Sequence, residues 1–314
     1  MGMMAFFTRR DPVALAMRPE TQREAIVASL LAWAWAVEAR DPWTGGHLWR
    51  VARFTELLAL RAGMAPQERA QVALGAFVHD IGKLAVPESI LRQHAPLSEA
   101  DHAVMRTHPE MGARLLAGHP YGPLVQDIVL LHHETPDGRG YPRGLSGPTI
   151  PTGARIVGLC DAFDAMTTRR PWRHAMSIDE ALSAIEVQLG RQFDDFLGQH
   201  FLALAREGAF EGIIGHSDEG MPLQHCTTCG PTMVQRREHH AGEHLHCPVC
   251  GARHRLVAAA AAGSAGGRHR SLIAEPTGAF GSPMDLLPQP DHALIRRFVQ
   301  DTVSLAVQTG YAPT

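Results

Sequence analysis

The sequence predicts a mainly α protein, in which a bundle of helices is followed by a small cysteine-rich β module and a flexible tail. Apolar residues recur at helical spacing in one segment after another, and almost nothing alternates with period two between residues 20 and 205. Four of the five cysteines form two Cys-x2-Cys pairs further along the chain. A run rich in Ala, Gly and Ser, residues 258–267, follows them and is typical of a flexible joint.

The helices can be placed from their apolar series and their end signals. Gly63 is a good stop for the second helix, and Pro66 lies where a third begins. Ser98 and Ser177 each precede an acidic residue by three positions, a pattern that resembles a helix start. The expected helices include residues 20–40, 46–62, a segment from Pro66 towards His79, 123–134 and 152–168.

Changes in composition divide the chain into segments. The region after about residue 208 becomes polar and glycine-rich, and the tail contains one amphipathic stretch near residues 292–307. We therefore expect a leader over 1–19, a helical domain over 20–207, a linker over 208–222, the cysteine module over 223–256, and a low-complexity joint and tail with one helix over 257–314.

Composition and charge exclude several classes of protein. Hydrophobic residues make up 45% and charged residues 19%, which suits a packed core. The formal net charge of -3 gives no basic field for a nucleic-acid partner. The apolar N-terminal run, residues 25–37, is shorter than the ~20 residues that cross a bilayer, and no signal peptide is visible. We expect a cytoplasmic protein without a membrane anchor.

Histidine is the compositional outlier, with 19 copies. Any single histidine is more often a core or surface residue than a ligand, and spacing alone does not prove convergence. Imidazoles and carboxylates without thiolates nevertheless suit divalent iron or manganese. Two such ions ~3.5–4 Å apart can share a hydroxide nucleophile in a phosphoryl displacement. The candidates, all at or near predicted helix ends, are His47, the pair His79-Asp80, His108, the pair His132-His133, and Asp161.

These residues lie in motifs that resemble the HD-GYP family, a branch of the HD-domain phosphohydrolases. The two signatures are HDIGK at 79–83 and HHETPDGRGYP at 132–142. The resemblance covers roughly residues 30–205, nearly the whole predicted helical region. The further matches are DPWTGGH at 41–47, HP at 108–109, GLSGPTIPTGARI at 144–156, CDAFDAMT at 160–167 and RPWR at 170–173.

The resemblance implies a helical bundle that hydrolyses cyclic di-GMP to the linear dinucleotide pGpG and, in some members, to GMP. It implies that Asp80 bridges two iron or manganese ions, and that Lys83 contacts the scissile phosphate and the attacking water. The implied metal ligands are His47, His79, Asp80, His108, His132, His133 and Asp161.

The resemblance also implies substrate contacts. Arg170 and Arg173 match the family's cationic pair and would hold the second phosphate, the alternative being a solvated helix end. Gly140 permits unusual backbone angles, and Tyr141 would line the guanine pocket or help to hold its loop. A purely structural turn is an equal alternative for that loop. Family members also use it to contact diguanylate cyclase domains.

Two positions depart from the family pattern. Some members place a glutamate four residues before the first ligand histidine, where it helps to hold a third metal. Trp43 stands there in this chain and cannot ligate, so we expect two metals and less complete hydrolysis to GMP. Cys160, beside Asp161, is expected to be a buried small hydrophobe, with a redox role as the weaker alternative.

The paired cysteines predict a separate structural zinc site. Seventeen residues lie between the pairs, inside the window for four-cysteine zinc binding, and each pair is followed by a glycine that suits a tight turn. The pattern resembles a zinc ribbon. A stapled mini-domain is the simplest interpretation. A protein contact is the next, and nucleic-acid binding by nearby arginines is the weakest. The four ligands are Cys226, Cys229, Cys247 and Cys250.

Three functional hypotheses remain open from the sequence. The first is an active cyclic di-GMP phosphodiesterase with a binuclear centre and an appended zinc ribbon. The second is a non-catalytic cyclic di-GMP receptor or scaffold, against which the intact Lys83 and ligand set weigh. The third is a hydrolase of another cyclic dinucleotide or nucleotide. The N-terminal helix and the tail segment are candidates for dimerisation, but neither has heptads long enough to argue it.

Overall fold

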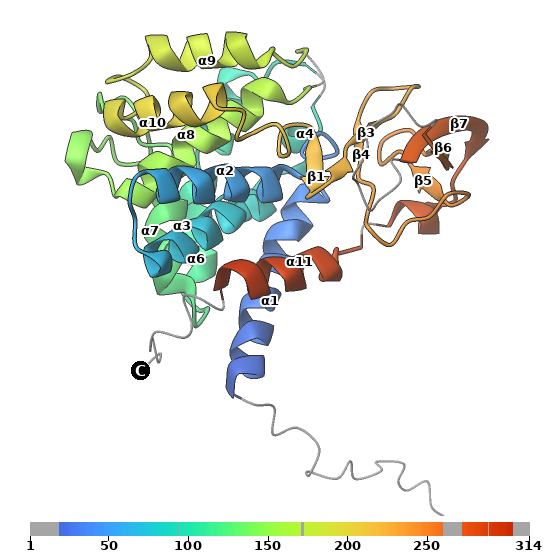
Figure 1. The fold of residues 1–314 in the computed structure, drawn as a ribbon, viewed down its shortest axis with the longest axis horizontal. Helices are drawn as coiled ribbons and strands as arrows, with labels where there is room; N and C mark the ends of the chain where they lie inside the picture. Colours follow the sequence, from blue (N-terminus) through green and yellow to red (C-terminus); the bar gives the residue numbers. More distant parts are fainter. Residues whose placement is uncertain (1–18, 94, 171–172, 260–271, 288, 304–314) are drawn as a thin grey trace, which may run out of the picture.

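The computed structural model describes residues 19–93, 95–170, 173–259, 272–287 and 289–303. Within these ranges the chain forms a group of packed helices with a smaller group of short strands at one side (Figure 1). The mainly α fold with a small β module in the C-terminal part is thus confirmed. Almost all of the predicted leader, and most of the predicted joint, fall outside the described residues.

The helices begin and end close to the positions that their apolar series predict. Ser98 and Ser177 cap their helices as expected, each accepting a hydrogen bond from the backbone amide three residues later. The helical elements up to residue 206 are α1 (Pro19–Glu38), α2 (His47–Arg61), α3 (Pro66–Val78), η1 (Ile81–Ala85), α4 (Glu88–Leu91), α5 (Glu99–Met105), α6 (His108–Leu116), α7 (Gly122–Leu131), η2 (Gly147–Thr149), α8 (Thr152–Thr167), α9 (Ile178–Val187) and α10 (Asp195–Arg206).

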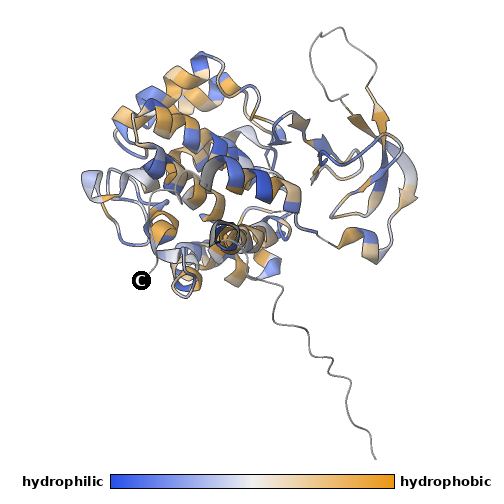
Figure 2. Ribbon diagram, turned by 60° about the horizontal axis from the view of Figure 1, so that its bottom comes forward, coloured by the Kyte–Doolittle hydropathy of each residue, from blue (hydrophilic) through white to orange (hydrophobic). Residues whose placement is uncertain are grey.

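An aromatic cluster holds α2, α8 and α10 together. The rings of Phe54 and Phe163 meet edge to face at 5.3 Å, and Phe201 packs 5.0 Å from Phe163. Figure 2 shows polar and apolar residues on different sides of the same helices, as expected when each helix buries one face. None of the helices in the described ranges combines the length and the apolar character that a membrane crossing requires.

The strands form three small antiparallel sheets: β1 with β2, β3 with β4, and β5–β6–β7. The last strand was not expected, because it lies in the segment predicted as joint and tail. Only Leu272 and Ala274 of its nine residues are buried, so it carries little apolar pattern. The strands are β1 (His216–Asp218), β2 (Met221–Pro222), β3 (Gln224–His225), β4 (Thr232–Met233), β5 (His244–His246), β6 (Ala252–Ala258) and β7 (Leu272–Phe280).

The segment predicted as a linker, 208–222, packs against the helices. Phe210 is buried against the ring of Phe54 at 5.0 Å, and Ser217 in β1 is also buried. A few large side chains among many glycines and polar residues anchor this segment, which its average composition did not indicate.

The predicted C-terminal helix is α11 (His292–Phe298), continued by a π-helical turn, η4 (Val299–Val303). It follows a short 3₁₀ helix, η3 (Pro283–Leu286), and lies against α1 (Figure 1). The ring of Phe298 packs 4.8 Å from that of Phe77 in α3. The segment is therefore part of the helical core.

Candidate metal centre

Histidine and aspartate side chains from five segments meet at one place among the helices. Most enter it from helix ends: His47 and His108 are the first residues of α2 and α6, while His79 and His132 follow the last residues of α3 and α7. Asp161 is the exception, because it lies inside α8. The members brought together are those predicted from the sequence: His47, His79, Asp80, His108, His132, His133 and Asp161.

The potential ligand atoms form two groups of three. Within each group the atoms lie no more than 4.8 Å apart, close enough to share one cation. Asp161 adjoins the first group, with Oδ1 at 3.5 Å from Nε2 of His47. The first group is His47, His79 and Asp80, and the second is His108, His132 and His133.

Asp80 belongs to the first group but also faces the second. Its Oδ1 is 3.3 Å from Nε2 of His108, whereas its Oδ2 is 3.5 Å from Nε2 of His79. One oxygen thus faces each group. If each group held a cation, a carboxylate in this position would contact both, and such paired ions could supply the chemistry of two-metal hydrolysis.

Four of the five histidines are anchored through Nδ1. In His47 this atom lies 2.8 Å from Oδ2 of Asp164. In His79, His108 and His132 it lies 2.6–2.8 Å from the carbonyl oxygen three residues earlier. An imidazole that donates from Nδ1 presents an unprotonated Nε2, and this arrangement orients and strengthens metal-ligating histidines. All four rings therefore present Nε2 to the centre.

The Nε2 atom of His79 provides a test of whether this site fits a cation. It is buried and has no hydrogen-bond partner among the described residues. A buried polar atom without a partner needs an explanation, and a divalent cation supplies one. Together with the imidazole and carboxylate donors around it, this atom shows that the site can hold divalent metals.

The pKa values of the histidine donors are shifted in two opposite directions. Burial lowers the pKa of His108 to about 4 and that of His133 to about 3, so both rings are neutral at pH 7. Burial also lowers the pKa of His47, but the neighbouring Asp164 and Asp80 outweigh it and raise the pKa to about 9. Without a cation His47 is therefore protonated at neutral pH.

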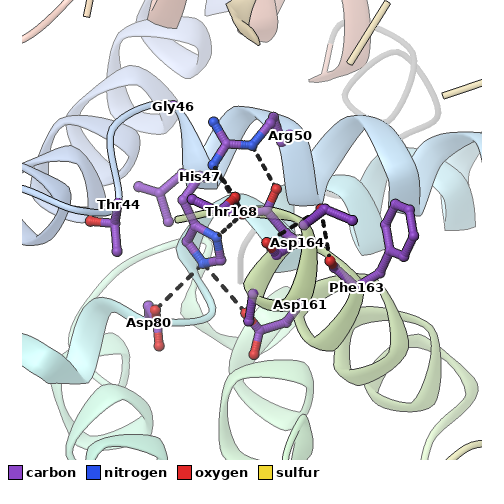
Figure 3. A network of polar contacts seen from close by, with 12 residues as sticks. Thr44, Gly46, His47, Arg50, Asp80, Asp161, Phe163, Asp164 and Thr168 are labelled. Carbon is purple, nitrogen blue, oxygen red and sulfur yellow. Dashed lines mark hydrogen bonds and ion pairs between the residues drawn. The ribbon is translucent and has the colours of Figure 1, made fainter. Parts of the chain in front are cut away.

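A buried ion pair behind His47 fixes this ligand. Arg50, fully buried, donates from Nε to Oδ1 of Asp164 at 2.6 Å and from Nη2 to Oδ2 at 3.0 Å (Figure 3). The same Oδ2 lies against Nδ1 of His47. Sequence reasoning missed both residues. The available signal was spacing, since each lies three positions after a ligand on the same helix and so shares its face.

Lys83 contacts the centre from η1. Its Nζ donates to Oδ2 of Asp80 at 2.6 Å. Burial raises the pKa of Asp80, but Lys83 and His79 outweigh it and hold that pKa well below its usual range. Gly82 permits the close packing of this turn, because a Cβ there would lie 1.8 Å from the carbonyl oxygen of His108.

The loop with Gly140 and Tyr141 packs against the second group of donors. The ring of Tyr141 stacks on His133 at 4.7 Å and 24°. A Cβ at Gly140 would lie 2.4 Å from the backbone nitrogen of Thr135, so only glycine fits there. The buried carboxylate of Glu134, another residue that sequence reasoning missed, accepts backbone hydrogen bonds at 2.6 and 2.8 Å from the loop that follows.

Arg170 and Arg173, the predicted cationic pair, lie in different environments. Burial lowers the pKa of Lys83, but Asp80 and Asp161 outweigh it and raise that pKa, a rise that the nearby charge of Arg170 partly offsets. Nη1 of Arg170 is 3.9 Å from Oδ2 of Asp41. Arg173 instead donates to the carbonyl oxygen of Ala165 in α8, and its backbone pairs with that of Arg170. The structure thus places Arg170 beside the centre and uses the Arg173 guanidinium to close a turn.

A cavity of about 450 Å³ opens beside the centre. It is lined by His133, Asp161 and Tyr141, and by Arg155 and Gln192 from α8 and the loop before α10. Its volume is in the range of ligand pockets, roughly 300–1,000 Å³. His132 and His133 of the second group, and Asp161 beside the first, are therefore accessible to a small molecule from this side.

The four cysteines of the C-terminal module also come together. Their Sγ atoms are separated by 3.7 Å from Cys226 to Cys250, 3.8 Å from Cys226 to Cys229 and 3.4 Å from Cys229 to Cys247. Disulfide bonds measure ~2.05 Å, so these sulfurs are unbonded. Four thiolates around one zinc at ~2.3 Å would lie about 3.8 Å apart. The cluster thus fits a tetrahedral ion.

Comparison with known proteins identifies a family and several relatives. A family model described as HD domain matches residues 33–197. Over 180 residues the chain is 39% identical to the cyclic di-GMP phosphodiesterase response regulator RpfG of Xanthomonas campestris, covering 57% of this chain and 47% of that protein. A cyclic di-GMP phosphodiesterase of Thermotoga maritima is 36% identical over 172 residues, covering 54% and 47%.

Another relative is named for a different substrate. A 3'3'-cGAMP-specific phosphodiesterase of Vibrio cholerae is 38% identical over 159 residues, covering 50% of this chain and 34% of that protein. Among solved structures, an HDG"Y"P protein from Bdellovibrio bacteriovorus is 24% identical with a TM-score of 0.44, covering 53% of each chain. The chain spans about half the length of the first curated relatives, or less.

Proposed function

The chain belongs to the HD domain family, and from this premise we propose that it is a metal-dependent phosphodiesterase that hydrolyses cyclic di-GMP to pGpG. Residues 20–207 would form the catalytic unit and residues 223–256 a zinc ribbon with one structural zinc. The observation that carries the proposal is the placement of Asp80, with one carboxylate oxygen towards each of two groups of buried donors.

We assign two iron or manganese ions to the centre, because its donors are imidazoles and carboxylates without a thiolate. The ions, when bound, supply an activated water and neutralise charge on the phosphate. Asp80 would contact both, with Asp161 on the side of His47 and His79. Trp43 offers no carboxylate for a third ion, so we expect pGpG to be the main product and GMP a minor one.

Lys83 and Arg170 would bind the phosphates. The Lys83 ammonium is held at Asp80 and is 20% exposed, so it can also reach an oxygen of the scissile phosphate. In a water-poor site such a charge stabilises the negative charge that grows in the transition state. Arg170 faces the same region and would hold the second phosphate. Arg173 would position Arg170 through the turn that they share.

The Tyr141 ring would form one wall of a base pocket. It is stacked on His133 and lines the cavity beside the centre, together with Gly140. An incoming guanine can extend this stack, because aromatic side chains are general platforms for bases. The same loop is the surface through which a diguanylate cyclase domain would bind, and exposed Arg139 lies within it.

A second cyclic dinucleotide is the main competing substrate. Relatives of similar identity are named for 3'3'-cGAMP, so the family match does not distinguish the two bases. A receptor without activity is a weaker alternative, because Lys83 and both groups of donors are in place.

Turnover by the purified full chain tests the proposal. The protein is loaded anaerobically with Fe(II) or Mn(II) and given equal concentrations of cyclic di-GMP and 3'3'-cGAMP, with products resolved by chromatography. We expect pGpG as the main product, no turnover by Asp80→Ala, and normal turnover by Asp127→Ala, whose carboxylate is exposed on α7. Faster loss of 3'3'-cGAMP would identify that dinucleotide as the preferred substrate. Binding of a dinucleotide without turnover would favour the receptor hypothesis.

A further inference from the structure

The four-cysteine module packs directly on the loop that presents the first metal ligand. This loop, residues 41–46, connects α1 to His47 at the start of α2. A Cβ at Gly45 would lie 2.9 Å from Cγ2 of Val234 and 3.1 Å from Cγ2 of Thr232 in β4. The backbone at Gly45 therefore approaches the module more closely than any larger residue would allow.

Strand β1 makes a second contact one residue later. Gly46 has a φ of 74°, and a Cβ there would lie 2.6 Å from Cα of Ser217. Ser217 Oγ in turn donates to the carbonyl oxygen of Gln235 at 3.4 Å, and Asp218 accepts from Nε of Arg237 at 2.8 Å. Strand β1 is thus tied to the cysteine module and to the residue that precedes His47.

A third contact runs through the buried ion pair. Nη1 of Arg50 donates to the carbonyl oxygens of Gly45 at 2.9 Å and of His216 in β1 at 3.0 Å. The other nitrogens of this guanidinium hold Asp164, which holds Nδ1 of His47. The same side chain therefore joins the C-terminal strands to the imidazole of the first ligand.

Trp43 supplies a fourth contact. Its indole is buried, and its Cη2 lies 3.6 Å from the position of a Cβ at Gly230, the turn that closes the first cysteine pair. Backbone hydrogen bonds to the first cysteine close this turn: Gly230 N donates to Cys226 O at 3.0 Å, and Cys226 N donates to Pro231 O at 2.9 Å. An apolar ring under this turn explains the aromatic residue at this position.

We propose that the four-cysteine module is a positioning element of the histidine–aspartate centre: metal on the cysteines rigidifies the β3–β4 hairpin, which holds the 41–46 loop and thereby fixes His47. The inference rests on the proposed metal centre and not on the identity of the substrate. Removing metal from the cysteines would loosen His47 and weaken metal binding at the histidine–aspartate centre, although the donors of the two sites are far apart in the chain.

A matched pair of substitutions within the module tests this coupling. Val234→Ala removes the Cγ2 methyl that occupies the space beside Gly45, whereas Val249→Ala makes the same change in the second cysteine pair, where the side chain is 40% exposed. The probe is Mn(II) added to the full chain, with its dissociation constant measured by electron paramagnetic resonance and zinc measured by elemental analysis.

We expect Val234→Ala to keep its zinc and to bind Mn(II) about 10-fold more weakly, the lower end of the effect of losing an outer-sphere partner. The dissociation constant of Val249→Ala for Mn(II) should stay within about 2-fold of the wild-type value. Val234→Ile, which keeps the branched side chain, should bind Mn(II) like the wild type. Cys229→Ser should lose zinc and bind Mn(II) at least as weakly as Val234→Ala. Circular dichroism checks that the helices of Cys229→Ser persist. If they do not, the comparison of the Val234 variants alone tests the proposal.

Wild-type Mn(II) affinity in Val234→Ala overturns the proposal, and so does an equal loss in Val249→Ala. These measurements use no dinucleotide. A wild-type protein that binds Mn(II) but leaves cyclic di-GMP intact would remove the phosphodiesterase proposal alone.

Discussion

The histidine–aspartate centre draws its donors from residues 47 to 161, whereas the cysteine site draws all four from residues 226 to 250. The first needs the packing of five helices before its atoms meet. The second needs two tight turns and a hairpin. Their donors also differ in chemistry, since imidazole and carboxylate suit iron or manganese and four thiolates suit zinc. The two sets of donors therefore suit different classes of metal ion.

The surroundings of the donors differ as well. Each anchored histidine is held at Nδ1 by a side chain or a helix-end carbonyl, and His47 depends on the Asp164–Arg50 pair. The cysteine site relies on backbone amides, such as Val249 N at 3.5 Å from Sγ of Cys247. A ligand oriented by a side chain, as His47 is by Asp164, is sensitive to substitution of that side chain, whereas ligands oriented by backbone groups depend mainly on the local turn. The following predictions test this contrast, from the largest effect to the smallest.

Removing one ligand of the histidine–aspartate centre should abolish most of its activity and leave the cysteine site occupied. His132→Ala deletes a buried donor of the second group, so we expect turnover to fall on the order of 10⁴-fold, as when one member of a catalytic set is removed. Zinc content should stay unchanged, because His132 is not among the residues of the cysteine cluster. Steady-state kinetics and elemental analysis measure both, with His102→Ala on α5 as an exposed control. Loss of zinc in His132→Ala would mean that the sites are not separate.

Weakening the support behind His47 should have the next largest effect. Asp164→Asn keeps the shape of the side chain but loses its charge, so we expect Mn(II) affinity to fall about 10- to 100-fold. The change also leaves Arg50 buried without its carboxylate, which costs about 3–5 kcal/mol of stability. Thermal denaturation therefore accompanies the binding titration. Unchanged affinity in a folded variant would show that the ion pair serves only stability.

The pH dependence of Mn(II) binding should report His47. Its pKa of about 9 means that a cation must displace a proton below that pH, so affinity should rise up to about 10-fold per pH unit and level off near pH 9. His108 and His133, with pKa values near 4 and 3, are already neutral above pH 5 and add no slope. Asp164 helps to raise the pKa of His47, so Asp164→Asn should flatten the profile. Titrations at pH 6.5, 7.5 and 8.5 test this, and a flat wild-type profile contradicts it.

A substitution beside the cysteines should have the smallest effect. Thr227 lies within the first pair, and its Oγ1 is 3.3 Å from Nε2 of buried His254. Thr227→Val removes this hydrogen bond but leaves the backbone amides around the sulfurs in place. We expect zinc affinity to change by less than about 3-fold, against the 10-fold or more expected for Asp164→Asn at the other centre. Competition with a chromogenic chelator measures it, and a larger loss would remove the contrast between the two sites.

The sequence predicted donors better than it predicted their supports. His79, Asp80 and the cysteines lie in compact motifs whose spacing carries chemical meaning. Asp164 and Glu134 carry a weaker signal, because a carboxylate that accepts buried hydrogen bonds looks in sequence much like a surface carboxylate. Their roles depend on which distant segment folds over them.

The fold shows the same division. Helices with strong apolar series and serine caps were predicted to within a few residues, since those signals are local. Strand β7 and the packed segment around Phe210 were not, because their few buried side chains gain meaning only from partners elsewhere. The position of the cysteine module on the 41–46 loop had no sequence signal except Trp43, which was interpreted only as a missing ligand.

The hydrogen bond from Arg50 to His216 spans 166 positions of the chain. During synthesis at ~5–20 residues per second, the second of these residues leaves the ribosome roughly 10 to 30 seconds after the first. The early histidines spend that interval without the strand that will hold His47 in place. The loop that presents His47 therefore gains its last contacts only after the C-terminal strands have emerged.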